Sequence, residues 1–568
     1  MKREKKFSVL ILMLTIITSC EFLDQEVETQ FREEQIIRSY DRAQNQSHAI
    51  YSQMRNGLAE VGNAIMASAS DEAVHTFEGS AIHRLTNGAW NPFDIPGNPW
   101  DQFFRGIRFC NILLETVDSI DLTPLTLNPT PDNQALFELR SANIERWKNE
   151  ARFMRAFYYF ELVKRFGGVP IIDRRITLDD DYMSLQRNTL EECIDFILRD
   201  LEIAAEGLPL VYPAPDLGRA TKGAALALKS RVLLYAASDL WNDSSWAAGY
   251  PYPELISLPA GDRVARWQAA ADAAKELIDL PGTGFTLANN YRALFNTFNN
   301  PEIIFTRRLG PSNTFEIDHF PIGFDLGESG TTPTQNMVDA YEMINGLPID
   351  DPLSGYDPQN PYANRDPRLE QSIITNNSIF RERPVELWQG GRDGRGVPQA
   401  SRTGYYLKKH VHEDLDLLIG ATAAKSWHLI RLADVYLMYA EALNEASPGN
   451  PDIKLYVDMV RQRNGVNMPP LPDGLSQEEM RQRIRNERRI EFAFEDHRLW
   501  DLRRWMQAVE YLNKPVNGMR ITLIEQGVFE YSPFVLENRV FRPEMYLFPI
   551  PQSEMNVMTN WAQNPLWN

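Results

Sequence analysis

The densest run of ionisable side chains lies between residues 485 and 504, in the segments Arg-Asn-Glu-Arg-Arg-Ile-Glu and Arg-Leu-Trp-Asp-Leu-Arg-Arg. Two of these carboxylates could form the acid and base pair of a hydrolase, which requires one group with a raised pKa. Each acid, however, has basic residues three or four positions away on a helix, and neighbouring cations keep a carboxylate ionised. The pattern therefore favours a structural charge network that fixes helices to one another.

Two other motifs point only weakly to ligand chemistry. His410-Val411-His412 could begin a metal site, but no third His or Cys follows nearby and the pair lies in a strand-like run. Residues 390–396, Gly-Gly-Arg-Asp-Gly-Arg-Gly, are similar to a phosphate-binding loop but lack the Gly-Lys-Ser/Thr ending and a following helix. We therefore predict a simple loop there, and expect neither a bound metal nor a cofactor.

Aromatic side chains beside polar groups in loops could bind sugars. A sugar ring lays its apolar C–H face on an aromatic ring, while its hydroxyl groups need polar partners. Four clusters have this composition: residues 71–77 with Trp90; Trp241-Asn242-Asp243 with Trp246, Tyr250 and Tyr252; Phe315, His319 and Phe320; and Trp388, Arg392, Tyr405 and Tyr406. The candidates for direct contact are Asp71, Trp90, Trp246, Trp388 and Arg392. For Trp90 and Trp241, burial in the core is an equally good interpretation.

The charge balance excludes some classes of ligand. The chain has 77 Asp and Glu against 58 Lys and Arg, a formal net charge of −19. This excess of acid disfavours nucleic acid, whose phosphates require a basic surface. It also disfavours polyanionic ligands, unless basic residues cluster locally.

The first twenty residues have the pattern of a secretion signal. Four basic residues within positions 2–6 precede an apolar run at 7–17, which is too short to span a bilayer. Ile17-Thr18-Ser19-Cys20 resembles the lipobox of bacterial lipoproteins. We therefore expect a signal peptide at 1–19, a lipidated Cys20 that anchors the chain to a membrane, and a polar tether at 20–34. An ordinary signal with a chance cysteine is the alternative.

The remaining sequence predicts a mainly α fold. Apolar periodicity and capping residues indicate helices at 103–117, 146–165, 221–240, 266–280, 427–446, 453–464, 476–494 and 498–511. Their pairing is typical of a tetratricopeptide-like scaffold. We assign this scaffold, with its ligand loops, to residues 35–281, a loop-rich irregular second lobe to 282–426, and helices with an extended tail that pack back on the scaffold to 427–568. Cys110 and Cys193 fit two buried free thiols, with a single disulfide as the alternative.

Five segments resemble the SusD/RagB family of outer-membrane, glycan-binding lipoproteins. They are residues 150–170, 219–236, 430–443, 485–504, and 546–551 together with Gln563-Asn564-Pro565. They span nearly the whole chain in the order expected for the family, after a lipobox. One departure is small, because Leu566 stands where the family usually has a glycine.

The resemblance implies a SusD-like fold and a non-catalytic role at the surface of the outer membrane. Family members bind oligosaccharide or polysaccharide and partner a SusC-like TonB-dependent transporter, over which they act as a lid. Two other interpretations remain open. An all-α glycoside hydrolase would need two carboxylates about 5–9.5 Å apart in an aromatic cleft. A lipid-tethered scaffold that binds only protein would expose an apolar patch and bury all four aromatic clusters.

Overall fold

The computed structural model describes residues 38–567. The expected signal peptide at 1–19, the lipidation site Cys20 and the tether at 20–34 lie outside the described residues. No helix within the described part of the chain has the length and apolar character needed to cross a membrane.

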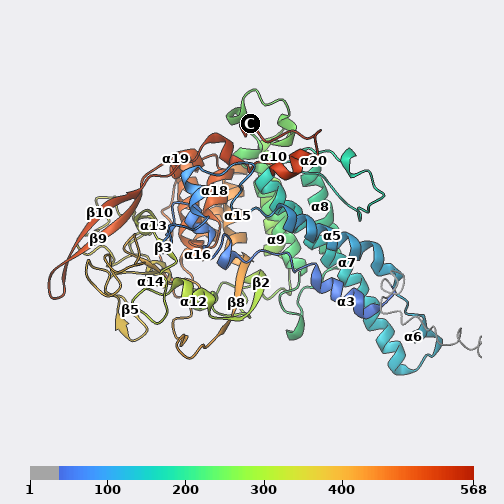
Figure 1. The fold of residues 1–568 in the computed structure, drawn as a ribbon, viewed down its shortest axis with the longest axis horizontal. Helices are drawn as coiled ribbons and strands as arrows, with labels where there is room; N and C mark the ends of the chain where they lie inside the picture. Colours follow the sequence, from blue (N-terminus) through green and yellow to red (C-terminus); the bar gives the residue numbers. More distant parts are fainter. Residues whose placement is uncertain (1–37, 568) are drawn as a thin grey trace, which may run out of the picture.

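Helices stacked side by side form the larger part of the molecule (Figure 1). The main ones are α5 (Trp100–Thr116), α7 (Pro131–Phe166), α8 (Leu190–Gly207), α9 (Lys222–Ala237), α10 (Arg263–Ile278), α15 (Leu432–Ala446), α16 (Pro451–Arg461) and α17 (Gln477–Glu491). They pack in the order α5, α7, α8, α9, α10, α15, so the C-terminal helices continue the array that the N-terminal helices begin. The mainly α fold with paired helices is confirmed.

Local capping explains why several helices begin and end where the sequence predicts. Thr221 accepts a hydrogen bond from the backbone N–H of Ala224, and Ser476 forms a capping box with Glu479. Gly167, at φ +71°, ends α7 in a conformation that favours glycine. The start of α7 was not predicted, because its first turns are polar and largely exposed and show no apolar stripe.

The predicted helix at 427–446 is wrong in its first part. Residues Ala423–Arg431 form strand β8, which pairs antiparallel with β2 (Ile303–Ser312), and the helix begins only at Leu432. Most of the end of β8 is buried on both faces, which removes the polar alternation that marks a strand. The predicted helix at 498–511 is also divided, into α18 (Arg498–Arg504) and α19 (Ala508–Leu512), with Met506 at φ +56° between them.

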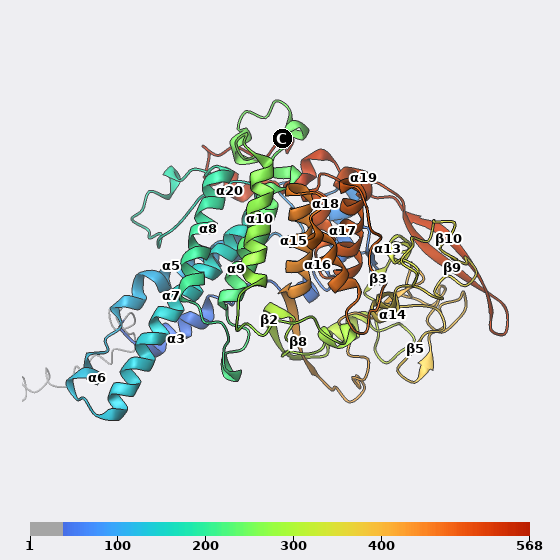
Figure 2. The same cartoon turned by 180° about the vertical axis from the view of Figure 1, so that it is seen from behind.

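A second, loop-rich lobe lies beside the helical array. It contains the short helices α12 (Thr314–His319), α13 (Gln335–Ala340) and α14 (Pro367–Ser372), several two- and three-residue strands, and a long hairpin of β9 (Val516–Glu525) and β10 (Val528–Glu537). Its hydrophobic core also takes in residues 58–73 and 490–521. The hairpin and the α6–α7 end of the array (α6, Thr123–Leu127) lie at opposite ends of the molecule (Figure 2).

Residues from the C-terminal segment complete the packing of the core. The Asn564 side chain donates hydrogen bonds to the carbonyl oxygens of Phe166 (2.9 Å) and Phe548, and accepts one from Arg187 (2.8 Å). The Trp567 ring packs on Trp90, with 4.7 Å between ring centroids. Residue 566, the departure from the family pattern, adopts φ +66°, the conformation that favours the glycine usual there.

Cys110 and Cys193 are both buried free thiols, as predicted, so the alternative of a disulfide is excluded.

Candidate functional site

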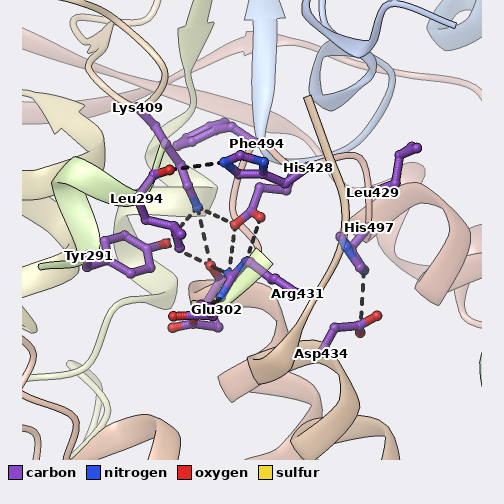
Figure 3. Close-up of polar contacts among 12 residues, drawn as sticks. Tyr291, Leu294, Glu302, Lys409, His428, Leu429, Arg431, Asp434, Phe494 and His497 are labelled. Carbon is purple, nitrogen blue, oxygen red and sulfur yellow. Dashed lines mark hydrogen bonds and ion pairs between the residues drawn. The ribbon is translucent and has the colours of Figure 1, made fainter. Parts of the chain in front are cut away.

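The charged motif at residues 485–504 lies in the interior and forms the predicted network. Arg431, which is 2% exposed, contacts the carboxylates of Glu302 (2.7 Å), Glu491 (2.5 Å) and Glu495 (2.8 Å). The Lys409 ammonium pairs with Glu495 at 2.6 Å. Figure 3 shows Lys409, Arg431 and Glu302 converging on one point from separate segments. These ion pairs join β8, the loop after α17 and the second lobe.

A second part of the network holds α15, α17 and α18 together. Arg488 bridges Asp434 and Asp501 at 3.0 Å each, and Arg504 contacts Asp501 at 2.8 Å. Burial alone would raise the pKa of Asp501, but the two guanidinium groups outweigh it and hold that pKa at about 2. The acid is therefore ionised at neutral pH, as the sequence predicts.

For Glu72 and Asp496, by contrast, the pKa is raised well above its usual range. Burial, reinforced by the neighbouring Asp71, raises the pKa of Glu72 to about 8. Burial, with the nearby charge of Glu60, raises the pKa of Asp496 to about 7. Glu72 is 1% exposed, whereas Asp496 is partly exposed and lines a cavity of about 70 Å³.

The described part of the chain contains no cluster of three or more His, Cys, Asp or Glu side chains that could hold a metal. His410 is buried, and its Nε2 lies 3.2 Å from the carbonyl oxygen of Phe494.

Two of the five candidate sugar-binding residues lie in the interior. Asp71 is 6% exposed and pairs with Arg489 (2.8 Å) and Arg498 (2.8 Å), residues more than 400 positions away in the sequence. Trp90 is 2% exposed and packs against Phe548 and Trp567. Both side chains are therefore part of the core on which these loops pack.

The second and third aromatic clusters are largely packed against other residues. Trp246 is half-buried and contacts the Tyr546 ring at 5.7 Å, whereas Tyr252 beside it is 46% exposed. Phe315, His319 and Phe320 are all buried. Because Tyr252 and Phe77 are exposed, the four clusters are not all buried, in contrast to what a purely protein-binding scaffold would show.

The fourth cluster borders a surface hollow. Trp388 is half-buried against Phe529, with 5.2 Å between ring centroids, and Arg392 is exposed and pairs with Glu386 at 2.7 Å. The loop that carries them runs along β9, where the Gln389 N–H donates a 2.9 Å hydrogen bond to the carbonyl oxygen of Ile521. Between loop and strand lies the β9 hollow, a cavity of about 340 Å³ lined by Leu387, Gln389, Arg395, Gly396, Arg520 and Ile521.

Sequence reasoning missed Arg395 and Arg520, which line this hollow and both contact one aromatic ring beside it. Their guanidinium carbons lie 4.6 Å and 5.5 Å from the centroid of Phe534 on β10. Arg395 stood inside the Gly-rich motif, but Arg520 lies 125 positions further on, so no local pattern could have joined them.

Arg402 connects the hollow to the first aromatic cluster. Its guanidinium group lies 3.5 Å from Glu78 and 4.0 Å from Glu537, and its charge acts on Arg395. Phe77, next to Glu78, is 60% exposed. The loop that carries Phe77 and Glu78, from the first cluster, thus contacts Arg402, which follows the loop of the fourth cluster. We use the name β9 surface for Phe77, Gln389, Arg395, Arg402, Arg520 and Phe534.

Comparison with known protein families gives two matches that together cover most of the chain. A model described as "SusD family" matches residues 301–567, and one described as "Starch-binding associating with outer membrane" matches residues 21–234. The SusD-like protein P38 of Formosa agariphila is 24% identical over 91% of this chain and 95% of its own length. A SusD-like protein of Bacteroides ovatus is also 24% identical, over 87% of this chain and 82% of its own.

Solved structures have the same fold over nearly the full length. A SusD-like protein from Bacteroides fragilis is 27% identical, covers 94% of this chain and 98% of its own, and superposes with a TM-score of 0.75. A SusD-like carbohydrate-binding protein from the same species is 25% identical, covers 92% and 99%, and has a TM-score of 0.74. The order of the five sequence segments, the helical array with its loop-rich lobe and these matches agree, and the chain belongs to the SusD/RagB family.

Proposed function

We propose that this protein is a cell-surface lipoprotein that captures oligosaccharide or polysaccharide and delivers it to a SusC-like TonB-dependent transporter. The observation that carries the proposal is the match to SusD family models over residues 21–234 and 301–567, one of which describes starch binding with association to the outer membrane. The carbohydrate-binding structural relative from Bacteroides fragilis adds support.

The β9 surface is the proposed glycan-binding face. It offers what a sugar requires, namely an exposed aromatic ring at Phe77 and polar groups at Gln389, Arg395 and Arg520 that can bond to hydroxyls. Trp388 and Arg392 lie on the same loop and remain candidates for contact. Asp71 and Trp90 are buried, so we assign them a supporting position beneath the binding loops.

Binding without hydrolysis agrees with the chemistry of the hollow. SusD-like glycan-binding proteins are non-catalytic. The residues that line the β9 hollow include no carboxylate, whereas a glycosidase needs a pair of them at the sugar. The carboxyl groups whose pKa is raised most, Glu72, Asp496 and Asp318, are not among the residues that line this hollow.

Affinity electrophoresis tests the binding function. Protein that lacks residues 1–20 should be retarded in gels containing the polysaccharide it recognises, from a panel of plant and host glycans, and should release no reducing ends. The change Phe77→Ala should weaken binding about 2- to 10-fold, because it removes a stacking surface worth about 0.5–1.5 kcal/mol.

The matched control is Tyr252→Ala, which removes an exposed aromatic ring from the second cluster and should leave affinity unchanged. Failure to bind any glycan, or hydrolysis by the pure protein, would contradict the proposed function. Equal losses of affinity in both variants would show that glycan does not bind at the β9 surface.

The membrane anchor can be tested separately. We expect Cys20→Ala to release the protein from the outer membrane and impair glycan uptake, while the affinity of the purified protein for glycan stays the same. Glu26→Gln, which changes the expected tether and keeps residues 17–20 intact, serves as the control. Retention of the Cys20→Ala protein in the membrane fraction would contradict lipidation at this residue.

A further inference from the structure

The β9 hollow carries positive charge without a balancing acid. Among residues 38–567, neither the Arg395 nor the Arg520 guanidinium group forms an ion pair or a hydrogen bond, and each is engaged only with the face of Phe534. Arg520 is exposed and Arg395 is partly buried. Two residues that line the hollow therefore carry ten N–H donors, and no acceptor within residues 38–567 pairs with them.

This arrangement contrasts with the rest of the molecule. Acidic residues outnumber basic ones by 77 to 58, and interior arginines such as Arg368, Arg431 and Arg504 each contact two or more carboxylates. In the hollow, burial lowers the pKa of Arg395, and the positive charges of Arg520 and Arg402 lower it further. Arg395 and Arg520 thus lie close enough to repel one another and have no carboxylate partner, whereas the neighbouring Arg402 pairs with Glu78 and Glu537.

The hollow is also held in shape by the protein itself. The buried carboxylate of Asp393 receives two hydrogen bonds from Arg383 (2.7 and 2.8 Å) and one from the backbone N–H of Glu386 (2.9 Å). This clamp fixes the loop that carries Arg395. Gly396, at φ +108°, presents no side chain to the cavity, and a Cβ there would meet no atom within 4 Å. A ligand would therefore meet a formed site, which lowers the entropic cost of binding.

We propose that the β9 hollow binds an anionic substituent of the glycan, a uronic acid carboxylate or a sulfate ester, between Arg395 and Arg520. The proposal rests on the proposed glycan-binding function and names its substrate class. Guanidinium groups bind carboxylate and sulfate oxygens through paired, charge-assisted hydrogen bonds. Phe534 holds both guanidinium planes in place, and the amide of Gln389 is available to a hydroxyl of the same sugar.

Pairs of matched glycans test this. The probes are polygalacturonate against methyl-esterified pectin, and dextran sulfate against dextran, each titrated by isothermal calorimetry at two salt concentrations. We expect tighter binding to at least one charged member, weakening with salt. Arg395→Gln and Arg520→Gln should each lower that affinity at least about 10-fold, and Arg520→Lys should restore only part of it.

The control is Arg263→Gln, which removes an exposed arginine from the helical array and should leave the affinity for every probe unchanged. Binding to polygalacturonate alone identifies a carboxylate, and binding to a sulfated probe alone identifies a sulfate ester. Equal affinity for the charged and neutral members, unchanged affinity in both Gln variants, or binding confined to neutral glycans would overturn the proposal while leaving glycan binding intact. Absence of binding to every glycan would overturn the proposed function as well.

Discussion

Replacement of Arg431 by methionine is expected to lower the free energy of unfolding by at least about 3–5 kcal/mol. The methionine side chain fills much of the same space, so the loss comes from charge rather than from a cavity. Glu302, Glu491 and Glu495 each lose a direct contact with this guanidinium, in an environment without solvent. Arg463, Lys409 and Arg368 remain next to these carboxylates, but Arg368 also pairs with Asp366 and Glu487, so the cluster is left with less positive charge than its acids need.

The same chemical change at the surface provides the control. Arg263, whose side chain is 42% exposed, pairs with Asp239 at 2.8 Å, and Arg263→Met should cost about 0–1 kcal/mol because solvent screens such a pair. Urea unfolding monitored by tryptophan fluorescence and circular dichroism measures both variants. A loss below about 1 kcal/mol for Arg431→Met would show that the carboxylates take up protons or find other partners at little cost.

The second large effect concerns Asp496 and pH. Its pKa is about 7 in the folded protein against 3.8 for a free side chain, so between these values the folded state holds a proton that the unfolded state has released. Stability should therefore fall as the pH rises from about 4 to about 7. The contribution of this group is at most about 4 kcal/mol. Its charged neighbours around the cavity are Glu60, Glu161, Lys164 and Arg165.

Asp496→Asn should remove most of this slope, because an amide does not titrate and can still accept the hydrogen bond from Trp500 Nε1. The loss in free energy of unfolding between pH 4 and pH 7 should therefore be smaller in the variant than in the parent protein. Asp473→Asn, at a side chain that is 94% exposed, should keep the parental slope. Thermal unfolding from pH 4 to pH 8 measures all three proteins, and a parental slope in Asp496→Asn would assign the effect to Glu72 or another group.

The sequence predicted those elements whose signals are local. Thr221, Ser476 and Gly167 act within one helical turn, so their effect can be read from neighbouring residues. Strand β8 could not be separated from α15, because the residues before Leu432 are as apolar as those after it. Backbone pairing with β2, more than 100 positions earlier, decides that segment.

In the candidate site, too, local signals could be predicted and long-range contacts could not. Loop composition drew attention to the segment around Trp388, but it could not show that Asp71 pairs with Arg489 and Arg498 in the interior. Arg395 and Arg520 meet only through the approach of the loop to β9. Whether a polar group finds a partner depends on the whole fold. Unpaired polar groups distinguish the proposed binding surface from the internal charge network.

The packing of residues 564–567 also has a consequence for how the protein is made. Asn564 and Trp567 fill positions beneath Phe166, Arg187 and Trp90, which are synthesised hundreds of residues earlier. These positions stay unfilled until residues 564–567 have been added to the chain. Packing around Phe166, Arg187 and Trp90 can therefore be completed only late in folding.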